Sequence, residues 1–130
     1  ASTVIKEDPW QTIEDNDESW NYTGFEIQQE QWNASGATLS VGKSNCMAEI
    51  TFDGKAIQLF SYRSIDAGSM KIYLDDKFIG NFNLSTTETY GQYYFKVFEK
   101  TALEHKSHTL KIIGDQTLKP KTIDLIRIKN

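Results

Sequence analysis

Strict alternation of apolar and polar residues in the segment 68–84, GSMKIYLDDKFIGNFNL, constrains the fold of this chain more than any other feature. Met70, Ile72 and Leu74 occupy every second position, and the period resumes after the polar run DDK. Successive side chains of a β-strand point to opposite faces of a sheet, so the segment predicts a half-buried antiparallel hairpin. In this hairpin the Asp75-Asp76 pair serves as the turn, because aspartate readily forms turn hydrogen bonds.

The same two-residue period recurs on both sides of this hairpin. Asp53-Gly54-Lys55 carries the Asp-Gly signature of a second tight hairpin. Turn residues follow one another every ~8–12 residues, which predicts an all-β antiparallel sandwich or barrel of about eight to nine strands. The expected strands are residues 20–25, 38–41, 47–52, 56–62, 69–74, 78–84, 92–98, 108–113 and 122–128, with 11–15 as a further short candidate and the longest irregular loop at 26–37.

Length and composition limit the classes of function. A chain of 130 residues suits one domain, which we place at residues 11–130 after an N-terminal arm at 1–10. The single cysteine, Cys46, excludes an internal disulfide and a cysteine-rich zinc site. A net charge of -4 without a basic run argues against nucleic acid or an anionic membrane as partner. No apolar run reaches the ~18 residues of a membrane span.

If the strands run alternately up and down, the loops divide between the two ends of the molecule. One end carries the short or plain connections 53–55, 75–77 and 99–106. The other end carries loops that mix aromatic, amide, acidic and basic groups. These are residues 42–45, 62–68, 85–92 and 115–119. Since binding residues concentrate on loops held by a rigid scaffold, we expect function at this second end.

A catalytic set is not evident in the sequence. The only histidines are His105 and His108, and we expect His108, at the start of a strand, to be a packed or capped imidazole. No Gly-X-Ser-X-Gly motif occurs. A carboxylate pair that includes Asp66 or Glu88 keeps a small hydrolase open as an alternative.

Acidic residues gather before the second predicted strand, at Glu14, Asp15, Asp17 and Glu18. Oxygen-rich loops of this kind can hold calcium, although the spacing and glycine of an EF-hand are missing. A solvated acidic turn and a structural calcium site assisted by Asp124 therefore both stay open.

Several aromatic residues lie at strand ends or in loops, where an exposed ring could pack against the C–H face of a sugar. These are Trp20, Trp32, Tyr62 and Tyr90. Ordinary packing is the alternative for each ring. Arg63 follows Tyr62 and Asn45 lies on a neighbouring loop, so a guanidinium and an amide are available for directed bonds to sugar oxygens.

The order of the segments IEDNDESWNYTGF, SGATLSVG, AEITFDGKAIQLF, DAGSMKIYLDDKFIGNFNL, HTLKIIG and TIDLIRI resembles the galactose-binding-like jelly-roll modules attached to bacterial glycoside hydrolases and esterases. The resemblance covers the chain from Ile13 onward. It departs at Asp75-Asp76-Lys77, where the family usually has Asp-Gly.

This resemblance implies a non-catalytic carbohydrate-binding module with a jelly-roll β-sandwich. It also implies a structural calcium near the first strand, with Glu14 and Asp124 as candidate ligands, and a sugar site in the loops at one end. The candidate sugar-binding residues are Arg63, Asn45, Tyr62, Asp66, Tyr90 and Trp20, with Tyr62, Tyr90 and Trp20 all eligible as the aromatic platform.

We therefore expect a monomeric module of a secreted or cell-surface bacterial protein. It would bind an oligosaccharide or polysaccharide, with galactose-containing polysaccharides as the first expectation, and direct a linked catalytic domain to it. The main alternative is a structural or adhesive jelly roll, such as a phage or cell-surface receptor-binding domain.

Overall fold

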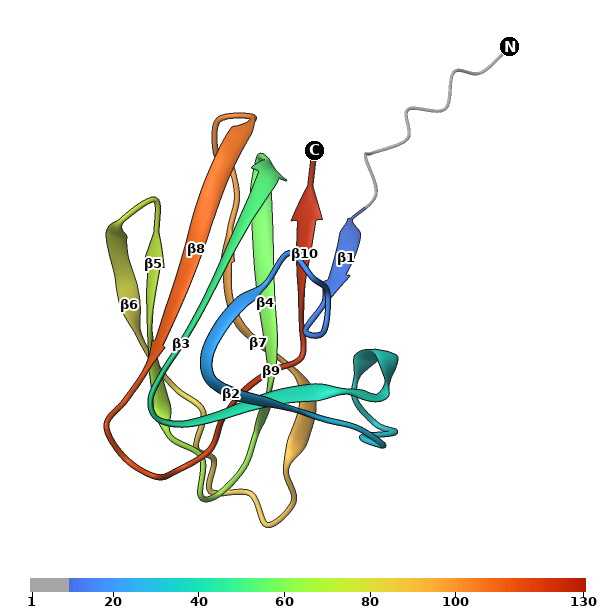
Figure 1. The fold of residues 1–130 in the computed structure, drawn as a ribbon, viewed down its shortest axis with the longest axis vertical. Helices are drawn as coiled ribbons and strands as arrows, with labels where there is room; N and C mark the ends of the chain where they lie inside the picture. Colours follow the sequence, from blue (N-terminus) through green and yellow to red (C-terminus); the bar gives the residue numbers. More distant parts are fainter. Residues whose placement is uncertain (1–9) are drawn as a thin grey trace.

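The computed structural model describes residues 10–130, which fold into strands joined by loops and one short 3-10 helix (Figure 1). The predicted arm at 1–10 lies, apart from Trp10, outside the described residues. The strands are β1 (Gln11–Glu14), β2 (Asn21–Gln28), β3 (Leu39–Gly54), β4 (Ala56–Arg63), β5 (Ser69–Leu74), β6 (Lys77–Asn83), β7 (Gln92–Lys100), β8 (Lys106–Gly114), β9 (Lys121–Ile123) and β10 (Leu125–Lys129), and the helix η1 spans Ser35–Ala37.

Two antiparallel sheets face each other and confirm the predicted β-sandwich. One sheet has four strands in the order β1-β10-β4-β7. The other has six, in the order β2-β3-β8-β5-β6, with β9 paired to β3. None of the helical structure in residues 10–130 has the length and apolar character of a membrane span.

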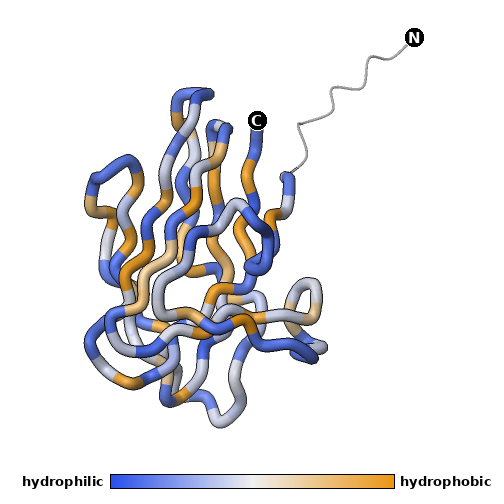
Figure 2. The backbone as a smooth tube through the Cα atoms, in the orientation of Figure 1, coloured by the Kyte–Doolittle hydropathy of each residue, from blue (hydrophilic) through white to orange (hydrophobic). Residues whose placement is uncertain are grey.

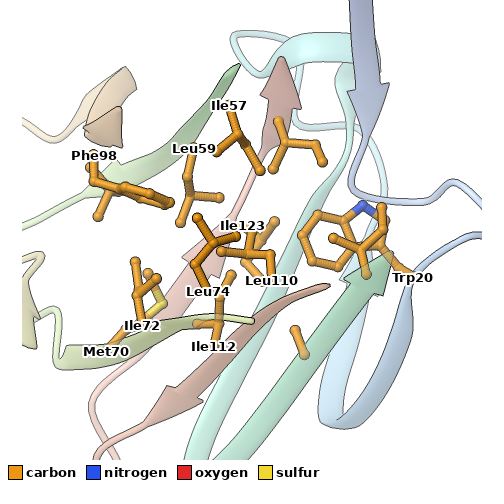
Figure 3. Close-up of a cluster of buried hydrophobic side chains, with 14 of the residues drawn as sticks. Trp20, Ile57, Leu59, Met70, Ile72, Leu74, Phe98, Leu110, Ile112 and Ile123 are labelled. Atoms are coloured by element: carbon orange, nitrogen blue, oxygen red, sulfur yellow. The ribbon is translucent and has the colours of Figure 1, made fainter. Parts of the chain in front are cut away.

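Hydropathy alternates along the strands (Figure 2). The apolar residues fill the core between the sheets (Figure 3). Met70, Ile72 and Leu74 are all buried, as predicted for one face of the central hairpin. Ile57, Leu59 and Ile126 of the facing sheet lie in the same cluster. Complete burial of each such side chain contributes about 1.5–3 kcal/mol to stability.

The central hairpin closes with a two-residue turn at Asp75-Asp76, as predicted. Both residues have positive φ, 51° and 64°, which is the signature of a type I′ turn. A register shift between Ile72 and Tyr73 then turns Phe78 to solvent, where its ring packs on that of Tyr73.

The predicted hairpin at Asp53-Gly54-Lys55 is wrong. β3 belongs to the six-stranded sheet and β4 to the four-stranded sheet, so this turn crosses from one sheet to the other. The Lys55 N–H donates to the carbonyl of Lys129 at 2.8 Å, and a Cβ on Gly54 would lie 2.8 Å from that oxygen. The Asp-Gly signature predicts a tight turn, but it does not determine whether the flanking strands pair.

The predicted strand at 38–41 and loop at 42–45 are parts of the long strand β3. Thr23 of β2 pairs with Met47 of β3, and Phe25 pairs with Gly42. Residues 43–46 of β3 therefore have no partner in β2 and form a bulge. On one side of this bulge β3 pairs with β9, and on the other it pairs with β8. The bulge therefore lets one strand pair with two neighbours and leaves residues 43–45 exposed, whereas Cys46 is buried. β2 also extends to Gln28, which shortens the irregular loop expected at 26–37.

The loops that mix aromatic, amide, acidic and basic side chains gather at one end of the sandwich, the lower end in Figure 1. Ser64 bridges to Ser85, Gly68 N–H donates to the carbonyl of Pro120 at 3.0 Å, and Asn45 N–H donates to that of Asp115 at 3.1 Å. We call this region, residues 42–45, 62–68, 85–92 and 115–120, the loop end.

His108 is a buried, fully bonded imidazole, as expected from the sequence. It is 3% exposed, its Nδ1 lies 2.6 Å from a carboxylate oxygen of Asp75, and its Nε2 lies 2.7 Å from the carbonyl of Glu104. Burial opposes the charged ring, but the bonds to Asp75 and Glu104 outweigh it and raise the pKa of His108 above its ordinary 6.5. Burial likewise opposes the charge of Asp75, yet the bonds from His108 and Thr109 lower the pKa of that carboxyl.

The pair should make stability depend on pH. The His108 contribution is complete below its unfolded pKa of about 6.5 and is lost as pH rises through its higher folded value. The Asp75 contribution is present above about pH 4 and is lost only at stronger acidity. We predict that His108→Gln costs more unfolding free energy at about pH 5.5 than at about pH 9 in urea titrations.

His105 provides the matched control, because it is the other histidine and is exposed. His105→Gln should cost the same small amount at both pH values. A loss for His108→Gln that does not change with pH would contradict the charged pair.

Candidate functional site

A cleft at the loop end contains two tyrosines side by side. The ring centroids of Tyr62 and Tyr93 are 4.5 Å apart, with planes inclined by 42°. The cleft has a volume of about 310 Å³, and we call it the tyrosine cleft. Polar side chains surround the two rings, namely Gln28, Gln31, Ser64, Asp66 and Thr122. Apolar rings beside amides, hydroxyls and one carboxylate can bind a ligand that has both C–H faces and hydroxyl groups.

A bulge in β7 brings the second tyrosine to this cleft. The register against β4 shifts between Ser61 and Arg63, and Tyr94 takes a positive φ of 56°. Burial raises the pKa of Tyr93, and the neighbouring Tyr62 and Asp124 raise it further, so its hydroxyl stays protonated at neutral pH and can donate.

Gly91 fixes the position of Tyr62. A Cβ at this position would collide with the Tyr62 hydroxyl oxygen and ring. The loop 85–91 can therefore approach the ring only because residue 91 has no side chain.

Of the six predicted sugar-binding residues, Tyr62 and Asp66 line the tyrosine cleft. Asp66 accepts a hydrogen bond from the Ser64 hydroxyl at 2.8 Å, and its side chain is exposed. Tyr90 is 84% exposed and directly precedes Gly91, which puts it at the rim of this cleft.

Arg63 points away from Tyr62, as successive residues of a strand must. Its guanidinium lies 4.3 Å from the Phe95 ring centroid, and Nη2 donates to the carbonyl of Ser85 at 2.7 Å. Its Nε is buried without a hydrogen-bond partner. Arg63 lines a separate cleft of about 570 Å³, the Arg63 cleft, together with Ile65, Asn83, Ser85, Thr86 and Thr87.

Asn45 lies on the bulge of β3 and is exposed, with its amide 3.4 Å from the Ser44 hydroxyl. It lines neither the tyrosine cleft nor the Arg63 cleft. The structure therefore separates Tyr62, Arg63 and Asn45, which the sequence suggested as one group.

Trp20 is not an exposed platform, so this candidate is wrong. It is 7% exposed, its indole N–H donates to the carbonyl of Glu14 at 3.0 Å, and it stacks on Tyr22 at 5.4 Å (Figure 3). The turn before β2 folds the ring into the core, because burying a large apolar ring is favourable when its N–H keeps a partner. Trp32, by contrast, is 78% exposed.

A buried lysine holds the loop end together. Lys121 is completely buried, and its Nζ lies 2.7 Å from a carboxylate oxygen of Asp115. The same Nζ donates to the carbonyls of Thr117, Lys43 and Asp115 at 2.6, 3.2 and 3.2 Å. Burial opposes the charge of Asp115, but the bonds from Lys121, Thr117 and Ser69 outweigh it and hold its pKa well below the usual range. One ammonium group thus joins the β3 bulge to the loop between β8 and β9.

Carboxylates gather on the other side of the tyrosine cleft. Glu14, Asp15 and Asp124 form an acidic cluster in which one oxygen of each lies within 4.8 Å of the others. Asp15 and Asp124 are buried; Asp15 accepts from the hydroxyls of Thr38 and Ser40 at 2.6 and 2.9 Å.

The remaining oxygens of the cluster are only partly satisfied. Ser35 donates its hydroxyl to Glu14 at 2.6 Å and its N–H to Asp124 at 3.0 Å. Oε2 of Glu14 is buried without a partner. Burial raises the pKa of Asp124 to about 7; the Ser35 N–H opposes this rise, whereas the charges of Asp15 and Glu14 add to it. Three carboxylates with an unpartnered oxygen are a ligand set that suits a cation.

Sequence reasoning missed Tyr93, Gln28, Gln31 and Lys121. Tyr93 lies in the predicted strand 92–98, and the bulge that brings it to the cleft leaves no clear sequence signal. The pair Lys119-Lys121 around Pro120 gave no hint that one lysine would be buried.

Comparison with known proteins agrees with this fold. No family model matches the chain. A stretch of 78 residues, 60% of this chain, is 32% identical to part of the A type blood α-D-galactosamine galactosaminidase of Flavonifractor plautii, and the chain spans 7% of that enzyme's length.

Among solved structures, a family 35 carbohydrate-binding module from an environmental isolate matches with a TM-score of 0.71, covering 92% of this chain and 93% of that one, at 14% identity. The GH26-CBM35 β-(1,4)-mannanase of Podospora anserina matches with a TM-score of 0.68 over 95% of this chain and 28% of its own, at 15% identity. The chain therefore has the β-sandwich fold seen in carbohydrate-binding modules, as the resemblance implied.

Because a buried ion pair becomes an unpaired buried charge when one partner is removed, Lys121→Met should lower the unfolding free energy by about 3 kcal/mol. Denaturant titration measures this loss, and Asp115→Asn with the double variant completes a thermodynamic cycle. The exposed Lys119 supplies the control, since Lys119→Met should change stability by less than about 0.5 kcal/mol. Equal small effects at both positions would contradict the organising role of Lys121.

Proposed function

We propose that this chain is a non-catalytic carbohydrate-binding module that binds sugars in the tyrosine cleft. The observation that carries the proposal is the Tyr62–Tyr93 pair surrounded by amide, hydroxyl and carboxylate groups at the loop end. The aromatic faces would pack against the C–H groups of a pyranose, while Gln28, Gln31 and Asp66 would bond to its hydroxyls.

The lining of the cleft supports binding rather than catalysis. Asp66 is the one carboxylate among its lining residues, and no histidine is among them. Glycoside hydrolysis needs two carboxyl groups that flank the scissile bond. An open cleft of this size gives modest affinity, because few ligand groups are desolvated.

The likeness in fold to a mannanase that carries a CBM35 supports a wider role for this module. We propose a linked catalytic domain whose local substrate concentration rises when the module binds, within a secreted or cell-surface protein. Galactose-containing glycans are the first candidates, and the 32% identical stretch of a galactosaminidase supports this choice.

The experiment is calorimetry and affinity electrophoresis against galactans, arabinans, xylans, mannans and glucans. We expect binding to at least one of these and a loss of about tenfold or more in Tyr62→Ala. Gly91→Ala should also weaken binding, because a methyl group there displaces the Tyr62 ring. Tyr73→Ala removes a half-buried tyrosine at the opposite end and is the matched control.

Arg63→Ala in the same panel tests whether the ligand reaches the Arg63 cleft, Tyr90→Ala tests the exposed ring that precedes Gly91, and Asn45→Ala tests the β3 bulge. Absence of binding to every glycan by the folded protein would overturn the proposal. It would favour the alternative of an adhesive domain whose loops contact a protein or cell surface.

We also propose that the acidic cluster holds a structural calcium ion. Glu14, Asp15 and Asp124 supply hard oxygen ligands, and the buried, unpartnered Oε2 of Glu14 fits an ion that the other two carboxylates share. Ser35, which bonds to both Glu14 and Asp124, ties the ion site to the loop 29–38. The ion would neutralise the repulsion among the three carboxylates and would take no part in a reaction.

Calcium should therefore raise the melting temperature of the chelator-treated protein. At a calcium concentration about 100 times the dissociation constant of the calcium site, the unfolding free energy should rise by about 2.7 kcal/mol, which calorimetric melting measures. Asp124→Asn should abolish the gain, whereas Asp17→Asn, which changes an exposed acid in the turn after Glu14 and Asp15, should keep it. Identical melting curves with calcium and with chelator would contradict the metal site.

A further inference from the structure

The tyrosine cleft continues into a second cleft on the neighbouring strands. This second cleft, the β2–β3 cleft, has a volume of about 360 Å³ and is lined by Gly24, Phe25, Glu26, Gln28, Val41 and Lys43. Gln28 and Val41 line both clefts. Two hollows that share walls in this way are contiguous.

Strand register explains why the two clefts lie on one face. Glu26 pairs with Val41, Gln28 pairs with Leu39, and Val41 pairs with Thr122 of β9. Directly paired residues point to the same side of a sheet, and so do alternate residues along a strand. The residues shared by the clefts therefore form a continuous surface that leads from Thr122, beside Tyr62, to Glu26.

The end of the β2–β3 cleft farther from Tyr62 is held in place by the β3 bulge and carries charged side chains. Lys43 belongs to the β3 bulge, and its carbonyl accepts a hydrogen bond from the buried Lys121 at 3.2 Å. Val41 offers apolar contact, while the exposed Glu26 and Lys43 offer an acceptor and a donor. From Phe25 to Gln28 the extended strand spans about 10 Å, and the tyrosine cleft adds to this length, so the two clefts together exceed a single small ligand.

We propose that the two clefts form one groove that binds a segment of several sugars in a linear glycan chain, rather than one terminal sugar. Tyr62 and Tyr93 form one subsite, and Glu26 and Lys43 form another. This inference rests on the proposed function, since it specifies the length of glycan that the same site takes. A flexible glycan gains affinity in such a groove because the second subsite adds contacts after the first has fixed the chain.

The test compares galactose, xylose, mannose and glucose with the linear hexasaccharides of β-1,4-galactan, β-1,4-xylan, β-1,4-mannan and α-1,3-glucan. Binding is followed by calorimetry for tight ligands and by NMR titration for weak ones. We expect at least one hexasaccharide to bind about tenfold or more tightly than its monosaccharide. Lys43→Ala and Glu26→Ala should remove several-fold of the hexasaccharide affinity and leave monosaccharide binding unchanged.

Both substituted residues are exposed, so the variants should keep the fold, which thermal melting verifies. Lys71→Ala removes an exposed lysine outside the groove and should leave all affinities unchanged. Equal affinity for a monosaccharide and its hexasaccharide, or no effect of Lys43→Ala and Glu26→Ala on the bound hexasaccharide, would overturn the groove. In that case a loss in Tyr62→Ala would still support the proposed function. No binding of any of these sugars, or binding that Tyr62→Ala leaves intact, would overturn both.

Discussion

The buried charge of Lys121 is the constraint on which the loop end depends. An ammonium group removed from water is costly unless it is paired and fully hydrogen-bonded. Lys121 meets that condition with the Asp115 carboxylate and three carbonyls, and these groups lie on two separate segments of the chain. The β3 bulge and the loop between β8 and β9 must therefore hold their positions for the charge to stay satisfied. A sandwich without disulfides thus obtains a rigid loop end from one ion pair and its surrounding bonds.

Irregularities in regular strands create the binding surface. The β3 bulge presents Lys43, and the β7 bulge brings Tyr93 against Tyr62. The loop 29–38 joins this surface to the acidic cluster, because Gln31 lines the tyrosine cleft and Ser35 bonds to Asp124. On β9 and the residue that follows it, Thr122 lines the cleft and Asp124 belongs to the acidic cluster. The core, the acidic cluster and the tyrosine cleft are thus built from neighbouring positions of the same few strands.

The alternation of residues was sufficient to predict the all-β fold, the central hairpin and the end of the molecule that carries the richer loops. It could not predict pairing across sheets, so the Asp-Gly turn at residues 53–55 was assigned to a hairpin. It also could not predict that the turn before β2 buries Trp20, or that β4 extends through Arg63, which then points away from Tyr62. Bulges explain why cleft residues such as Tyr93 were missed. One extra residue in a strand reverses which side chains face the cleft, and the amino-acid composition gives little sign of such a bulge.

Chemical-shift mapping of the nitrogen-15-labelled protein during titration with a bound glycan tests the central claim most directly. The account predicts that the largest shifts fall on the backbone amides of Tyr62, Tyr93, Gln28 and Gln31, with none at the opposite end around Phe78. Shifts centred elsewhere, or a glycan that binds without perturbing the amides of the tyrosine cleft, would contradict it.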